Sequence, residues 1–277
     1  MVIIPVPYDS TTSYRPGTRR GPLAIIEAST HMELFDEELK KETFHIGIHT
    51  MDQLEITAIG PEQMVERVSS VARDCLRKDK FPVMVGGEHS LTLGMVRSLT
   101  EKYRNLSVLQ LDAHADLRQE YQGTPYSHAS IGKRIKELCP LVQVGVRSMS
   151  REEWNYLPAS GVKTFFAQEV REKRGWIDEV LQSLSDEVYI TLDLDVFDPS
   201  IIPSVGTPEP GGLGWYEVLD LLRTVISRKR IVGMDIVELT PLPGNTAPDF
   251  LAAKLIYRMI GYWAEKVSAE CGVQSAE

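Results

Sequence analysis

The sequence predicts one α/β domain built on a mainly parallel, eight-stranded sheet with helices on both faces. Three observations lead to this prediction: eight short apolar runs, amphipathic stretches between them, and their alternation along a chain of 277 residues. The apolar runs are almost continuously hydrophobic, as strands that are covered on both faces must be. Alternating strands and helices are typical of doubly wound sheets and of α/β barrels.

The eight predicted strands are rich in valine and isoleucine. They are VIIPV from Val2, FHIGI from Phe44, FPVMVGG from Phe81, LSVLQLDA from Leu106, LVQVGV from Leu141, VKTFF from Val162, VYITLDLD from Val188 and IVGMDIVE from Ile231. Between them, apolar residues three and four positions apart predict helices that pack on the sheet. These helical stretches start at Pro61, Leu91, Gly175, Gly214 and Phe250.

No internal repeat, low-complexity tract or Pro/Ser-rich linker divides the chain, so residues 1–277 are expected to form a single domain. Two stretches rich in glycine and proline, 5–22 and 198–214, are predicted to be long loops at one rim of the sheet. Ligands of open α/β sheets bind beyond the carboxyl ends of the strands, where such loops gather.

Composition excludes several classes of function. The formal net charge of -9 argues against a nucleic-acid partner, which would need basic patches to contact phosphates. Cys75, Cys139 and Cys271 are far apart and lack a C-x-x-C spacing, so neither a disulfide framework nor a thiolate zinc site is indicated. No segment has the ~18 apolar residues of a membrane helix, and no export signal precedes the first strand. A cytoplasmic protein without membrane association is expected.

Side chains of the types that bind metals follow three of the predicted strands at every-second-residue spacing. They are His89, Asp112, His114, Asp116, Asp193 and Asp195. Residues two apart on an extended chain point to the same side, with about 6.5 to 7 Å between their Cα atoms. A single D-x-D motif is usually a solvated loop or a helix cap, and a lone histidine is usually packed. The combination at three strand ends favours a metal site.

The ligand types narrow the choice of ion. Four aspartates and two histidines without a thiolate suit Mn²⁺ or a similar cation better than structural zinc. Crowded carboxylates have raised pKa values unless cations offset their charge, and four carboxylates balance two divalent ions. Bridging carboxylates would hold two ions about 3.5 to 4 Å apart, close enough to share one hydroxide.

The order of motifs resembles the ureohydrolase family, which includes arginase and agmatinase. The motifs are PYDSTTSYRPGTRRGP near the amino terminus, GGEHS, DAHAD, TLDLDVFDP, and DIVELTP near the carboxyl terminus, so that the match covers nearly the whole chain. Each motif alone is a weak signal, whereas the ordered set is specific. The resemblance implies a three-layer, arginase-like fold and a homo-oligomer, trimeric or hexameric.

The resemblance also implies two manganese ions per subunit. One would be bound by His89, Asp112, Asp116 and Asp193, and the other by His114, Asp112, Asp193 and Asp195. Glu238 would hold a guanidinium group, and His128 would carry a proton to the leaving amine, a task that suits the pKa of histidine. Positions alone leave open that Glu238 is a loop carboxylate and His128 a surface histidine. Asp198, which precedes Pro199, suits a turn or a supporting role.

The implied reaction is attack of a metal-bridging hydroxide on the guanidinium carbon of a small cationic substrate, releasing urea. The loop LRQEYQGTPYSHAS lacks the Asn-x-Pro start and the Ser-Gly-Asn segment with which arginases receive an amino acid, and resembles agmatinases at Arg118, Glu120 and Tyr121. Agmatine is therefore the expected substrate, with putrescine as the product. N1-aminopropylagmatine, 4-guanidinobutyrate and arginine stay open as substrates. A metal-bound scaffold without activity is the non-enzymatic alternative.

Overall fold

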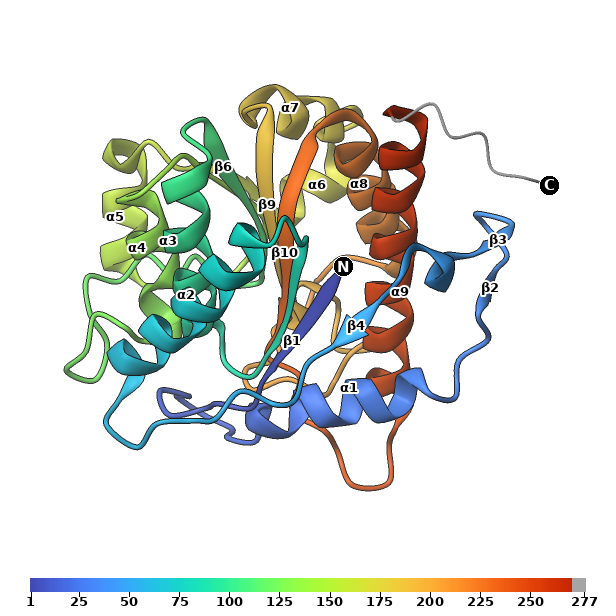
Figure 1. Cartoon of the computed structure of the whole chain (residues 1–277). Coiled ribbons are helices and arrows are strands. Elements are labelled where there is room, and N and C mark those ends of the chain that lie inside the picture. The colour runs from blue at the N-terminus through green and yellow to red at the C-terminus, as the bar shows by residue number, and fades with distance from the viewer. Residues whose placement is uncertain (271–277) are drawn as a thin grey trace.

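The computed structural model describes residues 1–270, which form an eight-stranded sheet between two layers of helices (Figure 1). The strands follow the spatial order β4-β1-β5-β10-β9-β6-β7-β8, and every pairing in this sheet is parallel. The predicted α/β fold with a parallel, eight-stranded sheet is confirmed.

The strands of the sheet are β1 (Val2–Val6), β4 (His49–Thr50), β5 (Pro82–Gly86), β6 (Leu106–Leu111), β7 (Leu141–Val146), β8 (Lys163–Phe166), β9 (Glu187–Asp193) and β10 (Arg230–Val237). A separate antiparallel hairpin, which the sequence did not reveal, consists of β2 (Phe35–Asp36) and β3 (Lys41–Glu42).

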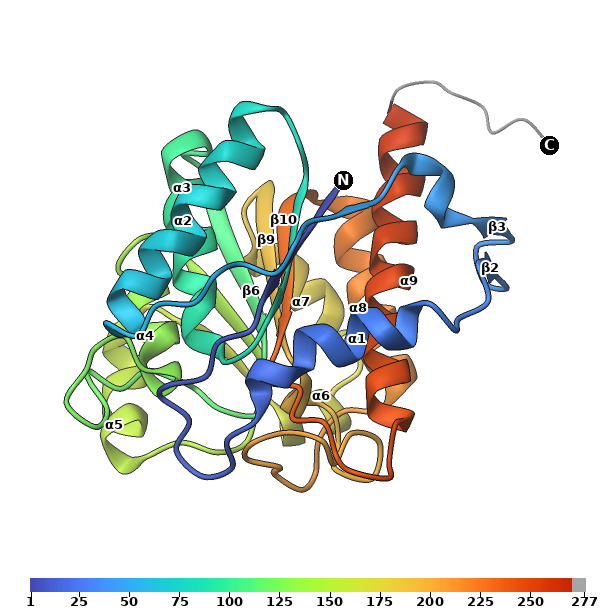
Figure 2. The ribbon, with the colours of Figure 1, turned by 60° about the horizontal axis from the view of Figure 1, so that its bottom comes forward.

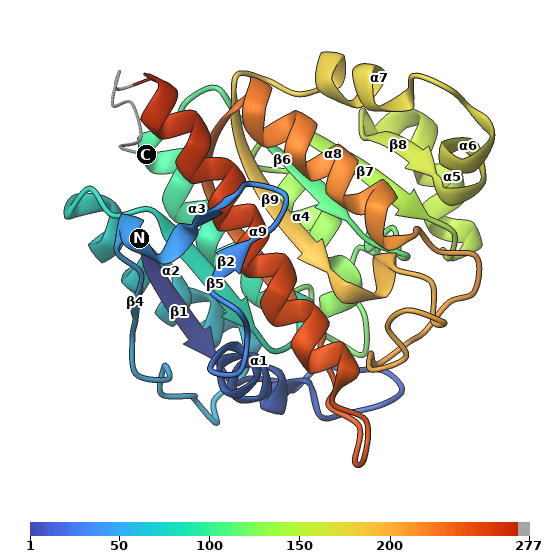
Figure 3. The ribbon, with the colours of Figure 1, turned by 90° about the vertical axis from the view of Figure 1, so that its right-hand side faces the viewer.

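Helices cover both faces of the sheet. One layer contains α2 (Pro61–Arg77), α3 (Thr92–Lys102), α4 (Ile131–Lys136) and α5 (Arg151–Ser160), with α2 and α3 side by side (Figure 2). The other layer contains α1 (Gly21–Ser29), α6 (Ala167–Glu172), α7 (Trp176–Ser183), α8 (Trp215–Arg228) and α9 (Ala247–Glu270). Figure 3 shows α8 and α9 packed against each other across this face.

Alternate side chains of the strands enter two separate hydrophobic cores. In β1, Val2 and Ile4 pack in the core under α2 and α3, whereas Ile3 packs in the core under α8 and α9. In β6, Val108 packs in the core under α2 and α3, and Leu109 packs in the core under α8 and α9. Burial on both faces explains why the strands read as continuous apolar runs.

The prediction of a strand from Phe44 is wrong. Thr43–Ile46 forms a 3₁₀ helix, η2, and the edge strand β4 follows it with only two residues. The hydrophobic side chain of Phe44 lines an apolar pocket next to α9 instead of packing in the sheet. The backbone N–H of Phe44 donates to the Tyr257 hydroxyl at 3.2 Å. Gly47, with φ of 79°, interrupts the extended backbone between these residues and β4.

Residues 198–214 form the predicted loop without a helix or strand, whereas the stretch 5–22 ends in the 3₁₀ helix η1 (Thr18–Arg20) and the start of α1. Pro22 lies in the first turn of α1, a position that tolerates proline because the first N–H groups of a helix have no partner. Cys75 and Cys139 are free and buried, and Cys271 lies outside the described residues. Within residues 1–270, no helix combines the length and the hydrophobicity needed to cross a membrane.

Candidate metal centre and active site

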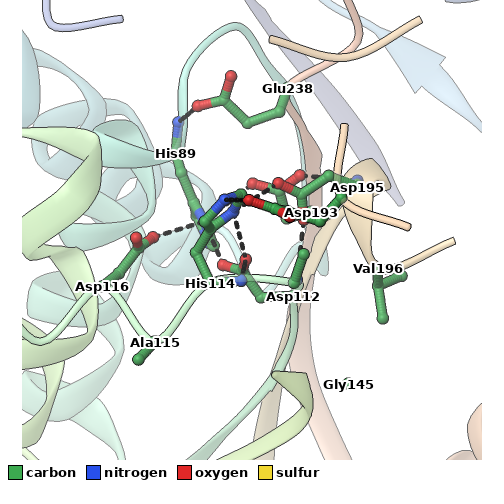
Figure 4. Close-up of polar contacts among 12 residues, drawn as sticks. His89, Asp112, His114, Ala115, Asp116, Gly145, Asp193, Asp195, Val196 and Glu238 are labelled. Carbon is green, nitrogen blue, oxygen red and sulfur yellow. Dashed lines mark hydrogen bonds and ion pairs between the residues drawn. The ribbon is translucent and has the colours of Figure 1, made fainter. Parts of the chain in front are cut away.

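The carboxyl ends of four adjacent strands meet at one point of the rim. In the order β5-β10-β9-β6, these strands are followed or ended by His89, Glu238, Asp193 and the loop that starts at Asp112. The parallel sheet therefore gathers side chains that are up to 149 positions apart, as the hydrogen bond from the His89 amide to Glu238 shows. Figure 4 shows His89, Asp112 and Asp193 pointing toward one another, whereas the Glu238 carboxylate lies against the backbone of His89.

All six predicted metal ligands lie together, and we call them the His/Asp cage. Two triads in it offer ligand atoms that all lie within 4.8 Å of one another: His89, Asp112 and Asp193 form one triad, and Asp112, His114 and Asp195 form the other. Asp112 belongs to both. Asp116, the sixth residue, has its Oδ2 atom 3.5 Å from the Nδ1 atom of His89. These groups could hold metal ions at two adjacent positions.

His89 shows most clearly that the His/Asp cage suits a cation. Its buried Nδ1 atom lies 3.1 Å from Asp112 Oδ2 and 3.3 Å from Asp193 Oδ2, yet makes no hydrogen bond in the described structure. Its Nε2 atom lies 2.9 Å from the Thr191 hydroxyl. We assign the ring proton to Nε2, because Thr191 is the partner there. The Nδ1 lone pair then faces two carboxylates, an arrangement that a metal cation between them, or a proton on Nδ1, would make favourable.

Backbone N–H groups fix the outer carboxylate oxygens. Asp112 Oδ1 accepts from the His114 amide at 2.6 Å, Asp193 Oδ1 accepts from the Asp195 amide at 2.9 Å, and Asp195 Oδ1 accepts from the Ala113 amide at 2.9 Å. In each of these aspartates the second oxygen, Oδ2, lies within 3.3 Å of a histidine Nδ1 atom of the His/Asp cage. Asp116 adopts φ of 52°, a left-handed conformation that is uncommon outside glycine and is typical of functional sites.

The electrostatics lead to the same conclusion. Burial, together with the Asp112 carboxylate, raises the pKa of Asp116 to about 7. Burial and the carboxylates of Asp195 and Asp112 raise the pKa of Asp193 well above its ordinary value. Burial alone would lower the pKa of His114, but Asp195 and Asp112 raise it to about 12. Without metal, bound protons offset the negative charge of the site, whereas two divalent cations would balance its four carboxylates.

A buried hydrogen-bonded chain supports His89 from behind. Thr191 Oγ1 donates to Asp235 Oδ1 at 2.6 Å, and Thr92 Oγ1 donates to Asp235 Oδ2 at 2.8 Å. Tyr189 also donates to Asp235. All of these side chains are buried. Asp235 thereby polarises Thr191 and orients the imidazole of His89, the role that outer carboxylates play for metal-binding histidines.

A second buried chain runs across three strands to Asp112. Thr164 of β8 donates to Gln143 of β7 at 3.1 Å, Gln143 donates to Gln110 of β6 at 3.0 Å, and Gln110 donates to Asp112 Oδ2 at 2.7 Å. The side-chain amides of Gln143 and Gln110 each accept one hydrogen bond through oxygen and donate one through nitrogen, as buried polar groups require. The orientation of Asp112 therefore depends on side chains well outside the His/Asp cage.

Glu238 and His128 lie beside each other at the same rim. Glu238 adopts φ of 68°, and its Oε1 atom accepts from the His89 amide at 2.7 Å and lies 3.7 Å from His128 Nδ1. The buried Nε2 atom of His128 makes no hydrogen bond in residues 1–270. Burial alone would lower the pKa of His128, but Glu238 and then Asp116 raise it above its ordinary value. His128 is therefore no surface histidine, and Glu238 is no exposed loop carboxylate.

Arg147 fastens the loop 198–214 to the metal-binding end of β9. Its guanidinium donates to the backbone carbonyls of Asp195 at 2.7 Å, Phe197 at 3.2 Å and Glu209 at 2.8 Å. Asp198 closes the same loop, because its Oδ2 atom accepts the Gly211 amide at 2.9 Å. This is the turn role that the sequence suggested for Asp198.

A pocket of about 220 Å³ opens onto the His/Asp cage. Its walls include His128, Glu238, Arg118, Tyr121 and Thr207. The loops on either side therefore form the walls that any bound molecule would contact. The fold and this site define a three-layer α/β protein with a His/Asp cluster that could hold metal ions at the carboxyl ends of its strands.

Comparisons with known proteins agree with this class. The family model of the arginase family matches residues 1–261. The N(1)-aminopropylagmatine ureohydrolase of Thermus thermophilus is 43% identical over 262 residues, covering 94% of this chain and 89% of that protein. The enzyme of the same name from Synechocystis sp. is 38% identical over 273 residues, covering 96% and 89%. The crystal structure of the agmatine ureohydrolase of Thermoplasma volcanium superposes with a TM-score of 0.88 at 33% identity, covering 97% and 91%.

The chain belongs to the arginase family. The prediction of the ureohydrolase family from the order of the motifs is thereby confirmed.

Several supporting residues escaped the sequence analysis. Asp235, Gln110 and Gln143 are polar residues in the middle of otherwise apolar strands, and that position was a signal that they have buried partners. Arg147 carried no such signal, because its partners are backbone carbonyls of a distant loop.

Proposed function

We propose that the chain is an amidinohydrolase that uses two manganese ions to hydrolyse the guanidinium group of agmatine, or of its N1-aminopropyl derivative, to the amine and urea. The observation that carries this proposal is the pair of His/Asp triads sharing Asp112 at the floor of a pocket, with Glu238 and His128 in its wall. The oxygen and imidazole ligands favour Mn²⁺, and the ions would lower the pKa of the water that they bind and so supply a nucleophile.

Glu238 is suited to hold the guanidinium group. Its Oε1 atom is fixed by the His89 amide at 2.7 Å, so the carboxylate keeps its orientation when the pocket is empty. A planar guanidinium pairs well with a carboxylate and would place its carbon over the His/Asp cage. The substrate's positive charge also suits a pocket whose acidic side chains outnumber its basic ones.

His128 is suited to give a proton to the leaving amine. Its Nε2 atom has no partner in the described residues, and Glu238 keeps the pKa of the ring above its ordinary value. Its backbone N–H donates to Thr11 Oγ1 at 3.0 Å, and Thr11 Oγ1 donates in turn to the buried carboxylate of Glu88 at 2.8 Å. The imidazole is therefore held in place from the amino-terminal loop.

The relatives favour two related substrates. Those of 43% and 38% identity are named N(1)-aminopropylagmatine ureohydrolases, and a structural neighbour is named an agmatine ureohydrolase. Both names describe a guanidino group four methylenes from an amine. Agmatine would yield putrescine, so we place the reaction in polyamine biosynthesis. We also propose a cytoplasmic homo-oligomer, trimeric or hexameric, whose mass light scattering would determine.

A urea-release assay tests the proposed activity. The manganese-loaded protein is given agmatine, N1-aminopropylagmatine, 4-guanidinobutyrate and arginine in parallel, and the same preparation stripped with a chelator serves as the control. We expect urea from agmatine or its aminopropyl derivative only with metal. The absence of urea from all four compounds would refute the activity, whereas a preference for arginine would refute only the choice of substrate.

A further inference from the structure

The carboxylates in the pocket wall already have partners. They are Asp116, Asp193 and Asp195 of the His/Asp cage, Glu238, and Glu153. Glu153 is buried and accepts the Leu117 amide at 2.8 Å and the Ser150 amide at 2.7 Å, so it joins α5 to the loop after β6. None of these five is free to receive a second positive charge on the substrate.

Glu209 is a further carboxylate at the edge of this pocket. It lies two residues beyond Thr207, which lines the pocket, and its Oε1 atom is 3.9 Å from Nε2 of His114. The side chain is 36% exposed, and within residues 1–270 its carboxylate makes no hydrogen bond, since Arg147 binds the Glu209 backbone carbonyl instead. The opposite ring nitrogen of His114, Nδ1, is 2.8 Å from Asp195 Oδ2. The imidazole ring of His114 therefore lies between the Glu209 carboxylate and the Asp195 carboxylate.

The backbone around Glu209 is held in place, which fixes the point from which its side chain extends. Arg147 donates to the Glu209 carbonyl at 2.8 Å and to the Pro210 carbonyl at 3.2 Å. The Gly211 amide donates to Asp198 at 2.9 Å. All of these hydrogen bonds of Arg147 go to backbone carbonyls, and none goes to the Glu209 carboxylate.

We propose that Glu209 receives the ammonium group that lies four methylenes from the guanidinium group of the substrate. This inference rests on the proposed function. With the guanidinium held at Glu238, the chain of four methylenes would pass the edge of the partly buried His114 ring and bring its amine to the rim. Arg118 of the pocket wall lies over the Tyr121 ring at 4.9 Å, and its Nε atom is 3.9 Å from Glu153.

The assignment explains how one pocket would accept both proposed substrates. Agmatine has a primary ammonium at this position, and N1-aminopropylagmatine has a secondary ammonium there with its extra propyl arm directed to solvent. In 4-guanidinobutyrate the same position carries a carboxylate, which Glu209 would repel. Glu209 would thus favour substrates with an ammonium group at this position and disfavour those with a carboxylate there.

The test compares two substrates that differ only at this position: agmatine and butylguanidine, which lacks the amine. For Glu209→Gln we expect kcat/KM for agmatine to fall by about tenfold, mostly through KM, because a charge-assisted contact is lost. With butylguanidine the same variant should change by less than about twofold. Glu209→Asp should recover part of the loss. Glu152→Gln, which neutralises an exposed carboxylate outside the pocket, should match the wild type with both compounds.

A loss in Glu209→Gln that is equal for agmatine and butylguanidine would refute the inference, since it would show that Glu209 acts only through His114. Unchanged kinetics with agmatine would refute it as well. In both cases the proposed activity would stand. Failure of the wild type to release urea from these two compounds and from N1-aminopropylagmatine, 4-guanidinobutyrate and arginine would overturn the activity and the inference together.

Discussion

Thr191→Val would test whether the buried chain behind His89 sets its affinity for metal. Valine has nearly the shape of threonine, so the substitution removes a hydroxyl without opening a cavity. That hydroxyl lies 2.9 Å from His89 Nε2 and 2.6 Å from Asp235 Oδ1. After the change, His89 Nε2 has no hydrogen-bond partner, while Asp235 keeps Thr92 and Tyr189.

The size of the effect follows from these contacts. One buried polar group left without a partner costs about 1 to 3 kcal/mol of stability, and the lost orientation of a metal-binding histidine costs about 10- to 100-fold in metal affinity. Thermal unfolding of the metal-free protein would measure the first effect, and Mn²⁺ titration calorimetry would measure the second.

The matched control is Thr92→Val. Thr92 also donates to Asp235, at 2.8 Å, but makes no hydrogen bond with His89. The Thr92→Val substitution should therefore lower the stability of the protein while leaving its Mn²⁺ affinity within about twofold of the wild type. Equal Mn²⁺ affinities for the wild type and Thr191→Val would refute the reasoning, as would an equal loss in both variants.

Three further predictions concern the site. Asp193→Asn removes a carboxylate oxygen 3.3 Å from His89 Nδ1, so elemental analysis should show loss of metal together with loss of urea release; retention of two ions would contradict its place in the centre. His128→Asn should keep both ions but turn over about 10²- to 10⁴-fold more slowly, and a pH–rate profile equal to that of the wild type would exclude proton transfer by His128. The metal-free protein should lose stability as pH rises from 5 to 8. The pKa of Asp116 is raised to about 7 in the folded state, so its contribution is present below the ordinary aspartate pKa and is lost as pH rises toward 7. The pKa of His114 is raised to about 12, so its contribution to stability is also lost as pH rises above the ordinary pKa of histidine. A thermal-unfolding midpoint that rises between pH 5 and 8 would contradict the assignments for Asp116 and His114.

The sequence predicted the sheet well because both faces of its strands are buried. Continuous apolar runs such as LSVLQL carry that information locally, and β6 begins and ends within the predicted range. The run from Phe44 failed because its hydrophobicity arises from packing against α9, and periodicity alone does not distinguish such a run from a strand. The hairpin of β2 and β3 has only two residues in each strand, too few to show a pattern.

The candidate site was predictable wherever its chemistry repeats in the sequence. The every-second-residue spacing of ligand-type side chains after β6 and at the end of β9 marks the site in the sequence, and the parallel sheet brings these strand ends together. The chain is not extended throughout, because Asp195 lies in the 3₁₀ helix η5 (Leu194–Val196) that follows β9. Asp235 and Arg147 were not predicted because their roles depend on tertiary contacts. Asp235 acts through Thr191 on a histidine 146 positions earlier in the chain, and Arg147 binds carbonyls of a loop about 60 residues away.

The measurement that tests the central claim most directly is urea release from agmatine as manganese is titrated into the metal-free protein, with bound metal counted in the same samples. The two triads that share Asp112 predict that occupancy rises to two ions per chain and that the rate of urea release reaches its maximum only as the second ion binds. A full rate at one ion per chain, or no urea at two, would contradict the two-metal amidinohydrolase.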